Sequence, residues 1–139
     1  MGINNSVIED CTLTGGNADY DTVDGFEFWG PCENVVVRRC TAIGFNNGTG
    51  DNDGHGFEVY GTSPSEICDN ILFVDCHAEG CRIGFTSEGG AGEDALHTNI
   101  ICQNCTGTDN VVADFGGLQG ATIYLQDSTG TQTGNVVTL

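Results

Sequence analysis

Four acidic residues in the first half of the chain have the types and spacing of a calcium site. Asp24 and Glu58 each belong to a glycine-phenylalanine signature, and Asp51 and Asp53 lie just before the second copy in a glycine-rich stretch. Ca²⁺ takes about six to eight oxygen ligands from carboxylates, amides and carbonyls. The pattern predicts one Ca²⁺ held by Asp24, by Asp51 or Asp53, and by Glu58. The alternative is that these acids are solvated surface charges.

Two further residues beside the signatures are candidates for proton transfer. His55 begins the second signature, and histidine is the side chain whose ordinary pKa lies closest to neutrality. Arg82 lies just before the third signature, Ile-Gly-Phe. If the chain is an enzyme, we expect His55 or Arg82 to be the catalytic group. For His55, the roles of metal ligand and of simple turn residue stay open.

Two aromatic residues occupy equivalent places beside the acids. Trp29 and Tyr60 each follow a signature phenylalanine by three positions. An outward-facing ring with a neighbouring carboxylate such as Glu27 can stack on a sugar ring and hydrogen-bond to it. Trp29, Tyr60 and Glu27 are therefore predicted to bind a ligand of the carbohydrate class. The alternative is that the two rings cover the protein's own surface.

These residues are positioned by an internal repeat of about 30 residues. In four segments a cysteine follows an asparagine by six positions: Asn5–Cys11, Asn34–Cys40, Asn70–Cys76 and Asn99–Cys105. A fainter fifth copy has Ser128 where the others have cysteine. The second signature follows the first each time, with its phenylalanine at Phe26, Phe57, Phe85 and Phe115. Two signatures with a common period indicate a solenoid.

Short strands at this period, without a helical pattern, predict an all-β fold. We expect a right-handed parallel β-helix of about four to five coils, with residues 1–139 as one domain. Alternation in the second repeat points Val35, Val37, Cys40 and Ala42 inward and predicts a bend at Arg39. The repeated cysteines and phenylalanines would form internal ladders. The repeated asparagines would stack at a corner, because asparagine tolerates left-handed backbone.

The remaining cysteines raise the question of a disulfide. Cys32 and Cys68 each lie two residues before a repeat asparagine, so they are equivalent positions in neighbouring repeats. Stacked Cα atoms about 4.8 Å apart fall within disulfide range. A Cys32–Cys68 bridge is the predicted pairing, whereas the ladder cysteines are interpreted as small buried hydrophobic residues.

Charge limits the partners of the chain. Three arginines, no lysine and 20 acidic residues give a formal net charge of −17, which excludes a basic nucleic-acid-binding stripe. No apolar run is long enough to span a bilayer. We expect an extracellular protein whose partners are a polysaccharide or copies of itself. Open strand edges at both ends predict a homo-oligomer or a segment of a longer chain.

Several motifs resemble the pectate lyases of polysaccharide lyase family 9, over about residues 17–90. They are Asp24-Gly-Phe, the Asn34-Val-x-x-x-x-Cys strand, Asn46-Asn47 before a Gly-Phe-Glu, and Gly84-Phe85 with Gly89-Gly90. More widely, the chain resembles the pectin-lyase-like superfamily of right-handed β-helices. The resemblance implies that acids of neighbouring coils hold calcium, with Asp24 and Glu58 at ligand positions. The family's paired aspartates are here Gly54 and His55, and its catalytic lysine position is Thr86.

Two functions follow as expectations. In the first, the chain binds or acts on an acidic polysaccharide with calcium help. In the second, it is a non-catalytic structural protein whose coils stack end to end into a filament, stalk or surface layer.

Overall fold

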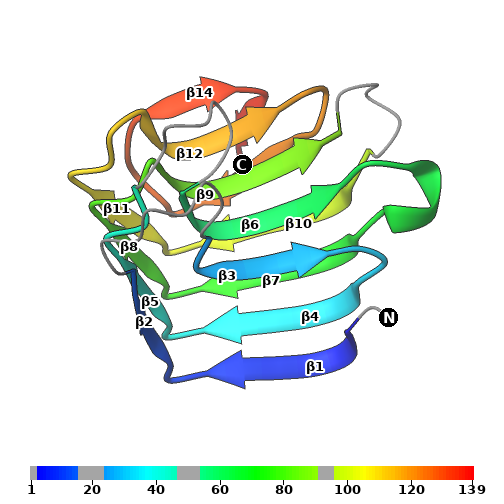
Figure 1. Ribbon diagram of the computed structural model, residues 1–139, viewed down its shortest axis with the longest axis horizontal. Coiled ribbons are helices and arrows are strands. Elements are labelled where there is room, and N and C mark those ends of the chain that lie inside the picture. Colours follow the sequence, from blue (N-terminus) through cyan, green and yellow to red (C-terminus); the bar gives the residue numbers. More distant parts are fainter. Residues whose placement is uncertain (1–2, 16–23, 47–53, 91–95) are drawn as a thin grey trace.

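The protein is all-β, and its strands form three parallel sheets (Figure 1). The structure is a computed structural model that describes residues 3–15, 24–46, 54–90 and 96–139. Within these ranges the only helical segment is a 3₁₀ turn, η1 (Pro64–Glu66). No helix in the described part of the chain has the length and apolar character needed to cross a bilayer.

Each sheet takes its strands from successive repeats. The first sheet has the order β1 (Asn4–Glu9), β4 (Glu33–Arg38), β7 (Asp69–Val74), β10 (Thr98–Gln103), β13 (Ile123–Gln126), β15 (Val136–Thr138). The second has β11 (Thr106–Thr108), β8 (His77–Glu79), β5 (Thr41–Ile43), β2 (Thr12–Thr14). The third has β14 (Gln132–Gly134), β12 (Ala113–Leu118), β9 (Ile83–Gly89), β6 (His55–Gly61), β3 (Phe26–Trp29). Parallel pairing between successive repeats is consistent with the predicted solenoid.

The repeat asparagines have the left-handed backbone that the sequence predicted. Their φ angles lie between 51° and 57° at Asn5, Asn34, Asn70 and Asn99. The side chains also form a ladder, because Asn70 Nδ2 donates to Asn34 Oδ1 at 2.7 Å and Asn34 Nδ2 donates to Asn5 Oδ1 at 3.3 Å. A left-handed residue costs little at asparagine, so β1, β4, β7 and β10 begin at the same bend.

A second left-handed corner lies just before each repeat cysteine or Ser128. The residues there have φ between 51° and 56°: Asp10, Arg39, Asp75, Asn104 and Asp127. This confirms the bend predicted at Arg39. Because the chain turns here, the first-sheet strand ends and the second-sheet strand begins two residues later.

The core is built from ladders of inward-facing side chains. Val35, Val37, Cys40 and Ala42 are buried, as the alternation predicted. The signature phenylalanines stack face to face, with ring centroids 4.8 Å apart for Phe26–Phe57, 4.7 Å for Phe57–Phe85 and 5.3 Å for Phe85–Phe115. Equivalent residues of successive repeats therefore lie one strand spacing apart.

The predicted Cys32–Cys68 disulfide is wrong for this structure, in which all eight cysteines are free thiols. Side chains at equivalent positions of parallel strands point the same way, so their Cβ atoms stay about 4.8 Å apart. A disulfide needs a Cβ separation of about 3.8 Å. Burial raises the pKa of Cys68 to about 12. The interpretation of the ladder cysteines as buried hydrophobic residues is confirmed for Cys40, Cys76 and Cys105. It is wrong for Cys11, which is exposed because its repeat lies at the end of the stack.

This arrangement predicts the thiol reactivity of the native protein. Cys11 is exposed and the other seven cysteines are buried, so we expect one fast-reacting thiol with Ellman's reagent. In guanidinium without reductant, all eight should react. Cys11→Ser is the control and should remove the fast phase. Fewer than eight thiols in denaturant would mean that a disulfide is present.

Candidate functional site

The third sheet brings residues of two repeats together at the start of β6. Asp24 lies two residues before β3, and His55 is the first residue of β6. In the pairing of β3 with β6, Glu27 lies opposite Glu58 and Trp29 opposite Tyr60. Glycine-phenylalanine is shared by both repeats, so the residues on either side of it are placed at matching heights in neighbouring strands.

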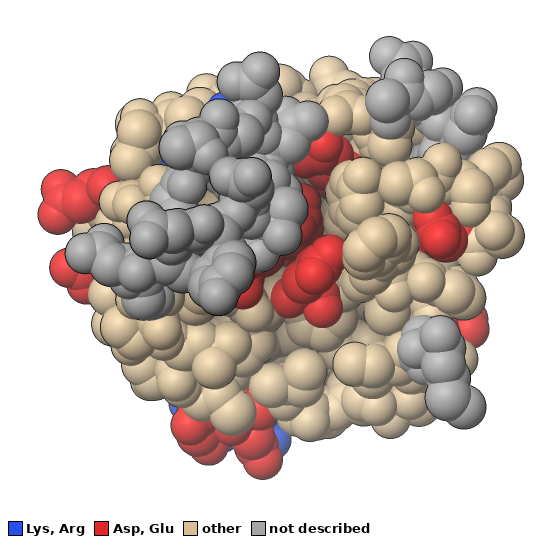
Figure 2. All heavy atoms as spheres, in the orientation of Figure 1, with Lys and Arg blue, Asp and Glu red and all other residues tan. Residues whose placement is uncertain are grey.

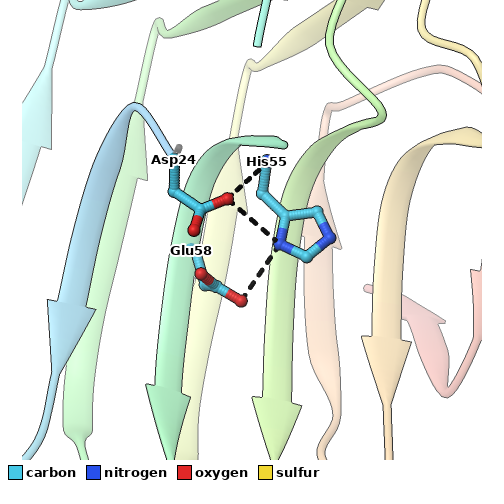
Figure 3. Close-up of side chains that lie close together, drawn as sticks. All are labelled: Asp24, His55 and Glu58. Carbon is cyan, nitrogen blue, oxygen red and sulfur yellow. Dashed lines mark hydrogen bonds and ion pairs between the residues drawn. The ribbon is translucent and has the colours of Figure 1, made fainter. Parts of the chain in front are cut away.

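Asp24, His55 and Glu58 converge (Figure 3). His55 Nδ1 lies 3.0 Å from Glu58 Oε1 and 3.6 Å from Asp24 Oδ1. Asp24 Oδ1 also accepts hydrogen bonds from the backbone N–H groups of Gly54, at 2.9 Å, and His55, at 2.7 Å. These two bonds hold the carboxylate against the histidine. We call Asp24, His55 and Glu58 the acid–histidine cluster.

Burial and like charges control the protonation of Glu58. Its side chain is 6% exposed, and the His55 side chain is fully buried. Burial raises the pKa of Glu58, the negative charges of Asp24, Glu88 and Glu27 raise it in the same direction, and together they bring it to about 10. At neutral pH and without a cation, Glu58 is therefore protonated, and its carboxyl group is a hydrogen-bond donor.

The predicted sugar platform lies on the same two strands. The rings of Trp29 and Tyr60 contact edge to face, with centroids 5.4 Å apart, and Trp29 is 53% exposed. Glu27 is also exposed. Acidic side chains gather in a hollow near the centre of the face on which β3, β6 and β9 lie (Figure 2). The structure thus places Glu27 and Trp29 on β3 and Tyr60 on β6, the strand that carries His55 and Glu58, and their role in ligand binding stays a prediction.

Arg82, a predicted proton-transfer residue, and Thr86, at the position of the lyase lysine, have defined surroundings. Arg82 precedes β9, and its backbone N–H donates to the carbonyls of Phe45 and Gly54, each at 2.8 Å. Arg82 is therefore next to Gly54, the residue before His55. Thr86, at the position of the lyase lysine, is buried, and its hydroxyl donates to the Gly116 carbonyl at 3.4 Å. Asp51 and Asp53 lie outside the described residues.

A buried polar group on β9 was missed by the sequence reasoning. Glu88 is 1% exposed, and its Oε1 accepts a hydrogen bond from Gln119 Nε2 at 2.6 Å. His97 Nδ1 accepts from the Cys68 N–H, so its Nε2–H donates to the Glu88 carbonyl, and burial lowers the pKa of His97. The register of the repeats could have predicted the position of Glu88, which lies opposite Tyr60 on the neighbouring strand, but not its burial.

The acid–histidine cluster has the donor set of a metal site. One ligand atom from each of its three residues lies within 4.8 Å of the other two. Two carboxylates and one imidazole are fewer oxygen donors than Ca²⁺ takes, so a calcium ion here would need further oxygen ligands from water or substrate. The described residues of the cluster therefore supply a partial site.

Comparison with protein-family models, with curated proteins and with solved structures finds no match to this chain.

Proposed function

We propose that this chain is an extracellular, right-handed parallel β-helix that binds an acidic polysaccharide with the help of a divalent cation. The observation that carries the proposal is the placement of an aromatic pair, with Trp29 exposed, and of the acid–histidine cluster on the two neighbouring repeats that form β3 and β6. The handedness follows from the general rule that crossovers between parallel strands are almost always right-handed.

The spacing of the two features suits a saccharide chain. Glu27 and Trp29 lie two residues apart on β3, as do Glu58 and Tyr60 on β6. Residues two apart on a strand point to the same side and are separated by about 6.6 Å. A sugar ring stacked on Trp29 would therefore place its neighbour near the carboxylates of Glu27 and Glu58.

Charge explains why the proposal includes a cation. At a net charge of −17, the chain repels an anionic polymer. Two of the three arginines pair with acids at the β1–β4 end: Arg38 with Glu9, and Arg39 with Glu9 and Asp10. A cation held by Asp24 and Glu58 can bridge protein and uronate carboxylates. Ca²⁺ is one ion that carboxylate oxygens bind.

Catalysis is a separate step within this proposal. β-Elimination requires a base for the proton beside the uronate carboxyl group and a cation that stabilises the resulting charge. His55 and Arg82 remain the candidates for the base. Release of an unsaturated uronate product, followed by ultraviolet absorbance, tests the catalytic step independently of binding.

Trp29 is the only tryptophan, so its fluorescence reports directly on the proposed site. We expect saturable quenching or a spectral shift on titration with polygalacturonate plus CaCl₂, and a loss of affinity on addition of chelator. Trp29→Ala should weaken binding about tenfold, equivalent to about 1.4 kcal/mol. Calorimetry measures this variant, because it lacks the fluorophore.

Val111→Ala is the matched control, because Val111 is an exposed apolar residue on the bend after β11. It should bind like the parent chain, and neutral dextran should not bind to either.

The alternative function, end-to-end stacking of copies, is favoured by exposed apolar residues on the edge strands, such as Val7 on β1 and Val137 on β15. A mass that grows with concentration, together with indifference to polysaccharide, would support stacking instead.

A further inference from the structure

We propose that the cation of the acid–histidine cluster is a first-row transition-metal dication such as Zn²⁺, Co²⁺ or Fe²⁺, and not Ca²⁺. The inference rests on the cation of the function proposed above and names its chemical class. Its basis is the third donor of the cluster, His55 Nδ1, which lies between the two carboxylates (Figure 3).

Donor chemistry separates the two classes of ion. Calcium sites in proteins are built from oxygen ligands. Neutral imidazole suits zinc, iron, nickel and copper, and one or two carboxylates complete many such sites. The cluster presents one imidazole nitrogen and two carboxylates from two neighbouring repeats. An oxygen-seeking ion would leave the nitrogen unused in the middle of the site.

The distances fit a small ion. Metal–ligand bonds of about 2.1 Å at angles between 90° and 109° place two ligand atoms about 3.0–3.4 Å apart. The observed separations from His55 Nδ1 are 3.0 Å to Glu58 Oε1 and 3.6 Å to Asp24 Oδ1. The third separation, between the ligand atoms of Asp24 and Glu58, is no more than 4.8 Å, so these two carboxylates would move closer together to complete a three-ligand face. The other coordination positions would be open to water or to a uronate oxygen.

The surroundings hold the three side chains in this arrangement. The His55 side chain is fully buried, and the side chains of Glu58 and Asp24 are 6% and 10% exposed. The two backbone N–H groups on Asp24 Oδ1 orient that carboxylate from the repeat that carries His55. Such outer hydrogen bonds typically change metal affinity by about 10–100-fold. The cluster is therefore preorganised by burial and by the two backbone hydrogen bonds to Asp24.

The test titrates the chelator-treated, full-length chain with CoCl₂, ZnCl₂ and CaCl₂, each alone. The parent for all variants is Cys11→Ser, because the exposed Cys11 thiol could bind soft metals elsewhere. We expect one equivalent of Co²⁺ with the visible absorption bands of a nitrogen- and oxygen-ligated ion. Competition by Zn²⁺ should remove these bands. Ca²⁺ should bind at least about tenfold more weakly than Zn²⁺.

His55→Asn is the decisive variant, because its amide oxygen can occupy the place of Nδ1 and change a nitrogen donor into an oxygen donor. It should lose at least about tenfold in Co²⁺ and Zn²⁺ affinity and keep its Ca²⁺ affinity. His77→Asn is the matched control on β8, outside the cluster, and should change neither. Glu58→Gln, which retains the side-chain volume, should weaken all three ions and covers the case in which His55→Asn fails to fold.

The results separate this inference from the function on which it rests. Equal or tighter binding of Ca²⁺, no stoichiometric Co²⁺, or Co²⁺ binding that survives both His55→Asn and Glu58→Gln would overturn the inference. Polysaccharide binding through Trp29 is measured separately, with each ion present in turn. If polysaccharide binds but no transition metal does, the inference fails and the carbohydrate proposal stands. If the metal binds and no polysaccharide does, the reverse holds.

Discussion

Glu58→Gln is expected to stabilise the ion-free protein at neutral and alkaline pH. The carboxyl group is buried beside Asp24 and near the charges of Glu88 and Glu27, and its pKa is raised to about 10 from an ordinary value of 4.5. A glutamine of the same size keeps a hydrogen-bond donor in the cluster but cannot ionise. The substitution therefore removes a group whose ionisation favours the unfolded chain.

The direction follows from proton counting. Between pH 4.5 and about 10, Glu58 carries its proton in the folded protein and has lost it in the unfolded chain. The folded state then binds one more proton, so the Glu58 contribution to stability is fully present below pH 4.5 and decreases as pH rises. The slope for one group is about 1.4 kcal/mol per pH unit. The difference in unfolding free energy between the glutamine variant and the parent should therefore grow by about 1.4 kcal/mol for each pH unit.

Urea denaturation of both chains between pH 5 and pH 9, with chelator present, measures this difference. Glu33→Gln, an exposed acid on β4, is the matched control and should show a difference that does not change with pH. A constant difference for Glu58→Gln as well would show that Glu58 is ionised in the folded protein. Any metal that binds the cluster should reduce the advantage of the glutamine, because the cation stabilises the carboxylate.

The repeat made most of the architecture predictable from the sequence. The recurrence of asparagine, cysteine and phenylalanine about every 30 residues predicted that each lies at one height in successive strands. The left-handed Asn34 and Asn70 and the stacked Phe57 and Phe85 confirm this. The same logic extends to the site. Asp24 and His55 each precede a signature phenylalanine by two residues, so they are neighbours by register.

The alternation of apolar and polar residues could not predict which side chains are buried on the outer face of the third sheet. Alternation indicates which side of a strand a residue faces, but it does not indicate whether that side is covered. Glu58, Thr86 and Glu88 face outward from the third sheet by alternation, yet all three are buried. The pKa of Glu58 depends on this burial, so its protonation could not be derived from the sequence.

The disulfide prediction failed for a related reason. Register placed Cys32 and Cys68 at equivalent positions, which is a statement about Cα atoms. A disulfide also requires side chains that converge, and in-register neighbours on parallel strands point in the same direction. Equivalence in a repeat therefore predicts stacking, as for the phenylalanines, better than it predicts covalent bonding.

Phe85→Ala is expected to be among the most destabilising single substitutions in the chain. The ring is fully buried and stacked on both sides, 4.7 Å from Phe57 and 5.3 Å from Phe115, and it contacts Phe73 edge to face at 5.9 Å. Removing a buried phenylalanine typically costs about 3–5 kcal/mol, through lost transfer free energy and the cavity left behind. Domains of this size have about 5–15 kcal/mol in total, so much of the stability is lost.

The loss of stability should depend on where a ring lies in the phenylalanine stack. Among the rings that the structure describes, Phe26 stacks on Phe57 alone, and it is 8% exposed, so Phe26→Ala should cost less than Phe85→Ala. Trp29→Ala removes a half-exposed ring from the outer face of the same sheet and should cost the least. Urea midpoints at unchanged m-value measure all three in reducing buffer. Equal losses for Phe26 and Phe85 would contradict a stack in which each repeat is stabilised by its two neighbours, because an interior ring loses two partners where a terminal ring loses one.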